Sequence, residues 1–264
     1  MPEVDPASVK IRPAASAIIL RDTPRGLEVF MVVRHHQIDF ASGAIVFPGG
    51  SVDPQDDQLD VAVPTTHPTQ APTSKFWLAC IRETFEEAGI LLARTSGQRR
   101  LIEAKDAAAI ERKHRAAILD GSRKFADMLI QENLEPATDL MVHFAHWITP
   151  IGPPRRFDTH FFLVAAPIQQ AGLHDGREAV DGIWIRPEEA IADADAGRRV
   201  MLPPTRLNLL KLSWDQTVRD AVARAQSSKV VTVLPKVVKG DFGRTLLLPI
   251  EAGYGMAEYK VSGH

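Results

Sequence analysis

Three glutamates and one arginine lie close enough together in this sequence to form a cation-binding group. Arg82, Glu83, Glu86 and Glu87 fall within a run that otherwise reads as a buried helix. Advancing about 100° per residue, the three glutamates share one side of that helix. Because like charges at this spacing repel each other, the cluster is either a solvated acidic face or a site that holds a cation. Carboxylate oxygens favour a hard ion, Mg²⁺ or Mn²⁺, over zinc.

The helix that would carry these charges is expected over residues 75–93. Its opposite side is a narrow apolar stripe formed by Trp77, Ile81, Phe85, Ala88 and Leu92. The single cysteine, Cys80, lies at the edge of that stripe and is expected to be a small packing residue. One cysteine forms neither an internal disulfide nor a thiolate metal cage.

A glycine pair stands just upstream, after a short apolar run over residues 43–46 that is expected to be a strand. Phe47, Pro48, Gly49 and Gly50 follow that run directly. A Gly-Gly pair allows a tight turn and lets the backbone approach a ligand closely. The turn and the acidic helix therefore frame one candidate site.

Taken together, these two segments resemble the box of the Nudix hydrolase family. Its pattern is Gly, five residues, Glu, seven residues, and then Arg-Glu-apolar-x-Glu-Glu-x-Gly-apolar. Residues 82–90 match the second half of the pattern, and Gly50 takes the leading Gly. Asp56 stands where the family has its first Glu.

This sequence departs from the family pattern within the box. Thr84 occupies a position that is usually apolar, and roughly 18 extra residues separate Asp56 from Arg82. The inserted segment, residues 58–74, is rich in Pro, Thr, Gln and Asp. It is expected to be a surface loop, or alternatively a lid that contacts substrate, because lengthening a loop costs little closure entropy.

Further segments are similar to the coenzyme A diphosphatase branch of the Nudix family, of the mammalian peroxisomal type and its bacterial relatives. The resemblance to this branch spans about residues 12–215. The segments that carry it are residues 43–50, 79–89, 147–150, 154–159, 184–185, 187–190 and 202–205. That branch carries a basic residue between its strand and its Gly, where Asp39 and Phe40 stand here.

The resemblance implies an α+β fold, a Nudix-type α/β/α sandwich around a mixed β-sheet with a helical insertion and a C-terminal β-hairpin extension. It also implies metal-dependent hydrolysis of a diphosphate bond in a nucleoside diphosphate-linked metabolite. CoA or acyl-CoA, giving 3′,5′-ADP and (acyl-)phosphopantetheine, is the first substrate to consider, and NADH and ADP-ribose are the alternatives. A non-catalytic Nudix-fold module that binds a nucleotide for regulation is the alternative from another class.

The same resemblance assigns roles within the box. The expected ligands of Mg²⁺ or Mn²⁺ are the carboxylates and one backbone carbonyl, from Glu83, Glu86, Glu87 and Gly50. Arg82 is expected to orient these carboxylates rather than to contact phosphate. Its expected partner is Asp56, which is one methylene shorter than the family's Glu, and Asp53 is the alternative partner.

Residues outside the acidic helix complete the expected site. Glu178, in a loop before the strand that holds Trp184, is a candidate general base or else a surface acid. The expected substrate-binding residues are two glycines and three arginines, namely Gly49, Gly50, Arg34, Arg155 and Arg156. The planar guanidinium groups of the loop pair, Arg155 and Arg156, could clamp phosphates.

Composition excludes several other classes of function. A net charge of −2 and a pI near 6.5 provide no broad attraction for nucleic acid or a membrane surface. No apolar run is long enough to span a bilayer, and the first residues lack a secretory signal. The last three residues are not the peroxisomal Ser-Lys-Leu address. We expect a cytoplasmic protein whose partner is a small-molecule nucleotide.

Local patterning also predicts the order of the elements. Strands are expected over residues 14–21, 27–34, 43–46, 140–149, 159–166 and 182–186. Helices are expected over residues 75–93, 101–120, 122–133, 187–196 and 205–225. We expect a Nudix domain over residues 1–228, in which residues 99–135 form a helical insertion that lies against the sheet or over the site.

The C-terminal extension, residues 229–264, is expected to pack on the core. Its alternating runs over 230–238 and 244–250 predict a hairpin with a turn at 239–243. This hairpin either packs along an edge of the core or acts as the arm of a homodimer.

The histidines show no metal-binding spacing. His143, His146 and His160 form no HExxH pattern and have no paired Cys/His neighbours. We therefore expect them to be surface residues or hydrogen-bonded strand residues rather than zinc ligands.

Overall fold

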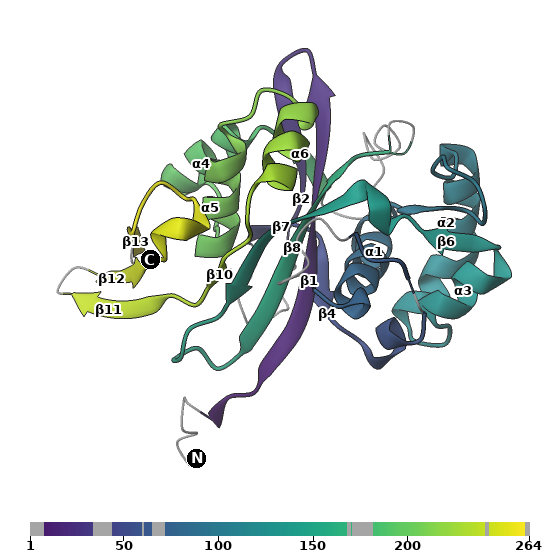
Figure 1. Cartoon of the computed structure of the whole chain (residues 1–264), viewed down its shortest axis with the longest axis horizontal. Helices are drawn as coiled ribbons and strands as arrows, with labels where there is room; N and C mark the ends of the chain where they lie inside the picture. Colours follow the sequence, from purple (N-terminus) through teal and green to yellow (C-terminus); the bar gives the residue numbers. More distant parts are fainter. Residues whose placement is uncertain are drawn as a thin grey trace.

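An eight-stranded mixed sheet forms the centre of the molecule, in a computed structural model that describes residues 8–33, 44–59, 61–64, 72–167, 170, 182–240 and 243–261 (Figure 1). The strand order is β10-β7-β8-β1-β2-β3, with β4 paired to β1 and β9 paired to β2. The strands are β1 Ile11–Thr23, β2 Gly26–Val33, β3 Ile45–Val46, β4 Gly49–Ser51, β7 Met141–Ile148, β8 Arg156–Ala165, β9 Gly182–Ile185 and β10 Thr232–Val233.

The long strand β1 organises this sheet. Its residues 14–20 are all buried, as expected for a strand that is covered on both faces. It pairs in parallel with β8 along one edge and antiparallel with β4 and β2 along the other. As a result, Ala15 lies opposite His160 of β8 and opposite Gly50 of β4. The expected strands are confirmed, and the glycine turn, residues 47–50, differs from expectation in that Gly49 and Gly50 pair with β1 as part of strand β4.

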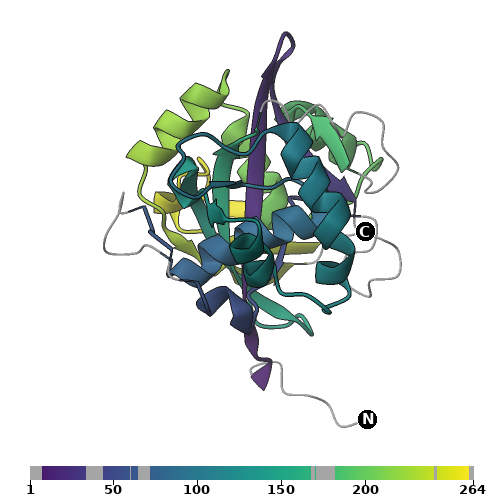
Figure 2. The ribbon, with the colours of Figure 1, turned by 90° about the vertical axis from the view of Figure 1, so that its right-hand side faces the viewer.

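Helices cover both faces of the sheet (Figures 1 and 2). One face is covered by α1 Ser74–Ala88, α2 Ala104–Leu119 and α3 Phe125–Gln131, and the other by α4 Pro187–Asp195, α5 Pro203–Leu212 and α6 Val218–Ser227. Two separate hydrophobic cores result, because alternate side chains of β1 point in opposite directions. Ala15 and Ile19 join the core beneath α1, whereas Ile18 joins the core beneath α4–α6. The α/β/α arrangement expected from the family resemblance is confirmed.

The helical insertion packs on α1. Gly121, at a φ of 76°, separates its two helices as the sequence predicts. The short strands β5 Ala93–Thr95 and β6 Leu134–Pro136 pair with each other where the insertion begins and ends. The rings of Phe85 and Phe125 lie 5.8 Å apart, so α3 contributes directly to the core that buries the acidic helix.

Two predicted helices end earlier than expected. The acidic helix ends at Ala88 rather than at residue 93, because Gly89 adopts a left-handed conformation at a φ of 66° and caps it. The single helix predicted over residues 205–225 is wrong, since α5 and α6 are separate. Thr217 begins α6 by accepting a hydrogen bond from the Asp220 N–H.

The C-terminal extension also differs from the expected hairpin. The run predicted as one strand over residues 230–238 is interrupted at Pro235, so β10 joins β7 while β11 Lys236–Gly240 begins a second sheet. This sheet contains β11, β12 Gly243–Leu247 and β13 Glu258–Val261. The expected β11–β12 pairing is present, and β13 adds a third strand.

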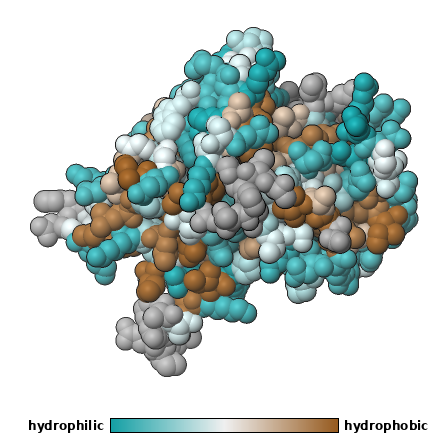
Figure 3. All heavy atoms as spheres, in the orientation of Figure 1, coloured by the Kyte–Doolittle hydropathy of each residue, from teal (hydrophilic) through white to brown (hydrophobic). Residues whose placement is uncertain are grey.

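The extension contacts the core through a buried tyrosine. Trp147 Nε1 donates to Tyr254 Oη at 2.8 Å, and Tyr254 Oη donates to Asn208 Oδ1 at 2.9 Å. Exposed apolar side chains remain on its outer surface, including Leu234 and Val238. Hydrophobic side chains gather on the surface at the β11–β12 end of the molecule (Figure 3).

Candidate active site

The glycine turn fits tightly against β1. Ser16 Oγ donates to the Pro48 carbonyl at 3.0 Å, and the Ala17 N–H donates to the same oxygen at 2.8 Å. A Cβ at Gly49 would lie 2.4 Å from the Ala15 carbonyl oxygen, which is a backbone atom that cannot move aside. The position therefore requires glycine so that β4 can pair with β1.

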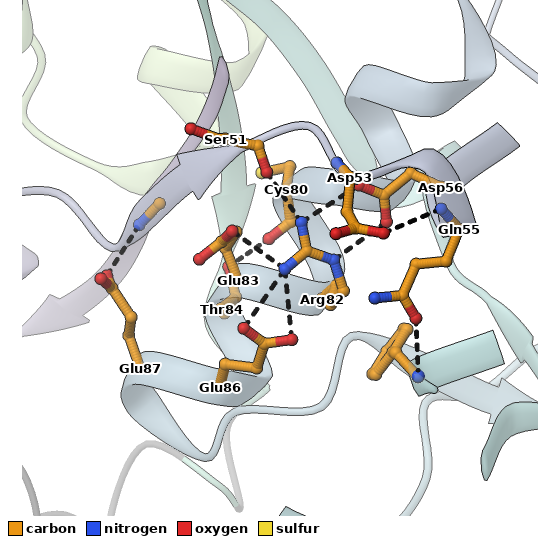
Figure 4. A network of polar contacts seen from close by, with 12 residues as sticks. Ser51, Asp53, Gln55, Asp56, Cys80, Arg82, Glu83, Thr84, Glu86 and Glu87 are labelled. Atoms are coloured by element: carbon orange, nitrogen blue, oxygen red, sulfur yellow. Dashed lines mark hydrogen bonds and ion pairs between the residues drawn. The ribbon is translucent and has the colours of Figure 1, made fainter. Parts of the chain in front are cut away.

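The second glycine accommodates the acidic helix. A Cβ at Gly50 would lie 2.5 Å from the carboxylate of Glu83, so this carboxylate rests directly on the β4 backbone. Glu87 Oε2 accepts a hydrogen bond of 2.9 Å from the Gly49 N–H (Figure 4). Two of the three predicted metal ligands, Glu83 and Glu87, therefore contact the glycine turn.

Arg82 connects the other acids. Its side chain is 95% buried, and its three guanidinium nitrogens all donate hydrogen bonds (Figure 4). Nε and one terminal nitrogen donate to the two oxygens of Asp56 at 2.9 and 3.1 Å. The other terminal nitrogen donates to Glu83 at 2.9 Å and to Glu86 at 3.2 Å. The expected pairing of Arg82 with Asp56 is confirmed, and the arginine orients two of the glutamates.

Asp56 is held as firmly as its partner. It lies in a short 3-10 helix, Pro54–Asp57, and is only 1% exposed. Its Oδ2 also accepts a hydrogen bond of 2.7 Å from the Asp53 N–H. The alternative partner, Asp53, instead accepts from the Gln55 N–H and caps the 3-10 helix. Because both Asp56 oxygens are engaged, Asp56 serves to position Arg82.

The interruption of the box leaves this pair intact. The extra residues begin after the 3-10 helix, so they do not separate Asp56 from the glycine turn. The described part of the inserted loop packs inward, with Leu59 and Val63 against the core that contains α1. Thr138 Oγ1 donates to the Ala62 carbonyl at 2.6 Å. These contacts anchor the first part of the loop, while residues 60 and 65–71 lie outside the described part.

The carboxylates carry more negative charge than Arg82 balances. Burial raises the pKa of Glu83 to about 7; the Arg82 guanidinium opposes this shift, and the charges of Glu86 and Glu87 add to it. Burial also raises the pKa of Glu86, again against the influence of Arg82. One guanidinium is shared among Asp56 and two glutamates, which leaves an excess of negative charge. An all-oxygen donor set with this excess fits a hard divalent ion such as Mg²⁺ or Mn²⁺.

A residue that sequence reasoning missed stabilises the end of the acidic helix. Arg115, on α2, donates to the Glu86 carbonyl at 2.8 and 3.0 Å and to the Glu87 carbonyl at 3.1 Å. These carbonyls have no partner within the helix, and a cation here also complements the helix dipole. The only local signal for Arg115 is its i, i+4 pair with Glu111.

The departure from the box at Thr84 is accommodated locally. Thr84 is fully buried, and its Oγ1 donates to the Cys80 carbonyl at 2.7 Å, one helical turn earlier. Cys80 is fully buried as expected, and burial raises the pKa of its thiol.

The remaining candidates lie elsewhere or are not described. Arg34 and Glu178 fall outside the described residues. Arg155 is exposed in the β7–β8 loop, whereas Arg156 is 6% exposed and its Nε donates to the Thr149 carbonyl at 3.0 Å. His160 and Gly50 both lie opposite Ala15 of β1, so they mark the same height in the sheet. Arg156 precedes His160 by four residues, so its backbone is displaced from that height by about 13 Å along β8.

Comparison with known proteins identifies the family. The profile of the NUDT19 Nudix domain matches residues 69–212, which is more than half of the chain and includes the whole acidic helix. The chain therefore belongs to the NUDT19 Nudix domain family. The matched range begins after Gly49, Gly50 and Asp56, which the structure brings into contact with the acidic helix.

Named relatives agree with this family. Putative nudix hydrolase 7 of Caenorhabditis elegans is 30% identical over 208 residues, covering 77% of this chain and 62% of that protein. Acyl-coenzyme A diphosphatase NUDT19 of Xenopus laevis is 26% identical over 225 residues, covering 70% of this chain and 59% of that protein. The matched region thus spans about three fifths of the length of each relative.

A solved structure supports the fold. A NUDIX hydrolase from Alicyclobacillus acidocaldarius superposes with a TM-score of 0.62 at 23% identity, covering 82% of this chain and 97% of that one. Among the described residues, no helix is both long and apolar enough to cross a membrane.

Proposed function

We propose that this chain is a Nudix hydrolase that uses Mg²⁺ or Mn²⁺ to cleave the diphosphate bond of CoA or acyl-CoA. The products would be 3′,5′-ADP and phosphopantetheine or its acyl form. The observation that carries the proposal is the buried Arg82–Asp56 pair, whose guanidinium also donates to Glu83 and Glu86. The CoA assignment rests on the sequence segments shared with that branch and on the name of the Xenopus laevis relative.

The proposed metal ligands are Glu83, Glu86, Glu87 and the backbone carbonyl of Gly50. A diphosphate bridge carries negative oxygens that repel an attacking hydroxide, and a bound divalent ion neutralises them and lowers the pKa of water. The protein contributes the orientation of the carboxylates. Arg82 acts as a positioning residue, because all three of its guanidinium nitrogens already donate to Asp56, to Glu83 and Glu86 or to the Ser51 carbonyl.

The other roles remain predictions from the sequence. We propose Glu178 as the general base and Arg34 and Arg155 as phosphate-binding residues. Arg156 stays a candidate for phosphate binding through its two terminal guanidinium nitrogens, because its contact with the Thr149 carbonyl uses Nε. A cytoplasmic location and a homodimer are likewise expectations from the sequence alone.

A substrate panel tests the proposal. CoA, an acyl-CoA, NADH and ADP-ribose would each be incubated with the full chain and Mg²⁺ or Mn²⁺, with a chelator-treated control, and the products separated by chromatography. We expect metal-dependent release of 3′,5′-ADP from CoA or acyl-CoA at the highest kcat/KM of the panel. Preference for NADH or ADP-ribose would refute the substrate, and absence of any turnover would indicate the regulatory module instead.

A further inference from the structure

A second group of ligand-type side chains lies on β7 and β8, away from the glutamates. It consists of His146, Asp158 and His160, whose ligand atoms all lie within 4.8 Å of one another. Asp158 and His160 are two residues apart on β8 and therefore point to the same face of the sheet. His146 lies opposite His160 on the neighbouring strand.

A β-bulge brings a third histidine to the same place. The register of β7 shifts between His143 and Ala145, which inserts one residue into the strand. Phe144 and Ala145 consequently both point into the core beneath α4–α6. His143 and His146, three residues apart, then share the opposite face, which strict alternation would not allow. His143 Nε2 lies 2.9 Å from His160 Nδ1.

Hydrogen bonds already orient these rings. His146 Nε2 contacts a carboxylate oxygen of Asp158, and His146 Nδ1 lies 2.8 Å from Thr232 Oγ1 of β10. A histidine that binds a metal through one ring nitrogen typically donates the other N–H to an oxygen, and Thr232 can accept this bond. The ring of His160 stacks on that of His146 with 3.9 Å between their centroids.

One of the three side chains is buried and the other two are partly exposed. His160 is only 7% exposed, and its ring packs against Phe76 and Phe162 as well as His146. The side chains of His146 and Asp158 are 15% and 32% exposed, so an ion can reach them from solvent. Two imidazoles and one carboxylate form the donor set that three-ligand zinc sites use.

We infer that His146, Asp158 and His160 form a binding site for a divalent transition ion of the zinc type, distinct from the Mg²⁺ or Mn²⁺ site on α1. The ion would take the place of the hydrogen bond between His146 Nε2 and Asp158, and the single N–H of His146 would then lie on Nδ1 and donate to Thr232 Oγ1. His143 would hydrogen-bond to the other ring nitrogen of His160. Ligands about 2.0–2.1 Å from a tetrahedral ion lie about 3.3 Å apart, so no separation, each being within 4.8 Å, has to shorten by more than about 1.5 Å, while His146 and Asp158 must move apart to admit the ion. Rotation of the imidazole rings can supply this movement.

The two sites are separated by the acidic helix. Gly50 and His160 flank Ala15 on opposite sides, which places their backbones about 10 Å apart across the sheet. Between them, α1 packs on β1. Its Phe76 ring lies 4.4 Å from the His160 ring, at the opposite end of the helix from Glu86 and Glu87. Occupancy of one site can therefore be measured without altering the ligands of the other.

Equilibrium dialysis of the metal-stripped full chain against Zn²⁺, with excess Mg²⁺ present, tests this site. We expect one Zn²⁺ per chain in the wild type and in Glu86→Gln. We expect Asp158→Asn and His146→Gln to weaken binding at least tenfold, and the exposed control Asp139→Asn to leave it unchanged. Thr232→Val, which keeps all three ligands, should weaken binding by up to about tenfold through loss of the partner of His146.

Co²⁺ in place of Zn²⁺ supplies a second readout, because a tetrahedral Co²⁺ complex absorbs visible light. The band should appear in the wild type and in Glu86→Gln and be absent from His146→Gln. If the wild type binds no Zn²⁺, or if binding is lost in Glu86→Gln but kept in His146→Gln and Asp158→Asn, the group is a hydrogen-bonded network and the inference is wrong. A negative result for Zn²⁺ binding does not affect the proposed hydrolase activity, because that activity depends on the glutamates of α1.

Discussion

Replacing Asp56 with Asn should disrupt the site by removing the charge that holds Arg82. The side chains of both residues are at least 95% buried, and Arg82 makes two hydrogen bonds to Asp56. Removal of one partner from a buried ion pair costs about 3–5 kcal/mol, because the other charge remains buried. Arg82 keeps its contacts to Glu83, Glu86 and the Ser51 carbonyl, so we expect the lower end, about 3 kcal/mol.

Urea unfolding followed by circular dichroism measures this loss. With an m value of about 3 kcal/mol/M, a loss of about 3 kcal/mol lowers the urea midpoint by about 1 M. The metal-dependent rate should also fall by about 10–100-fold, as is typical when groups that orient metal ligands are removed. Asp53→Asn is the matched control, since Asn also caps helices well and Asp53 contacts the Gln55 N–H rather than Arg82.

The reasoning would be refuted by a small effect. If Asp56→Asn keeps its urea midpoint within about 0.2 M of the wild type and turns over CoA at the same rate, the pair does not hold the site. Equal losses in Asp53→Asn and Asp56→Asn would show that the 3-10 helix matters, rather than the contact to Arg82.

Three further predictions follow from neighbouring contacts. Gly49→Ala should lower the free energy of unfolding by about 1–3 kcal/mol, because its Cβ meets the backbone of β1. Gly50→Ala should mainly lower activity, because its Cβ displaces Glu83. Urea unfolding and rate measurements on both variants distinguish the loss of stability from the loss of activity. Burial lowers the pKa of Lys211 from 10.5 to about 8, so the unfolded chain binds more protons between these values and stability should rise with pH there. Lys211→Met should abolish that rise, measured by urea unfolding at pH 8 and pH 10. Arg115→Met should leave the last carbonyls of α1 without a partner and speed amide hydrogen exchange near residue 88, with Arg112→Met as the control.

The parts of the fold that could be predicted are those that local patterns determine. The apolar stripe of α1, the strands flanking the first turn and Gly121 between two helices are all visible as periodicity or as a turn residue. The Arg82–Asp56 contact was predictable because the family spacing marks both residues, even across the inserted loop.

The parts that could not be predicted depend on contacts between distant segments. The break between α5 and α6 is stabilised by Asp215, a buried acid whose partner is Arg224 on the next helix. The pairing of β10 with β7 and the contact of Arg115 with α1 join segments that share no local pattern. The histidine cluster requires a bulge that strict alternation along the strand would not suggest.

The rate of 3′,5′-ADP release from CoA by Glu86→Gln at saturating Mg²⁺ tests the central claim most directly. Glu86 contacts Arg82 at the centre of the site, while Glu188→Gln, on the surface of α4, provides a control of the same chemical change. We predict a loss of roughly 100-fold in kcat for Glu86→Gln, as is typical when a group that stabilises transition-state charge is removed, and none for Glu188→Gln. If Glu86→Gln releases 3′,5′-ADP as fast as the wild type, the glutamates of α1 are not the metal site of this enzyme.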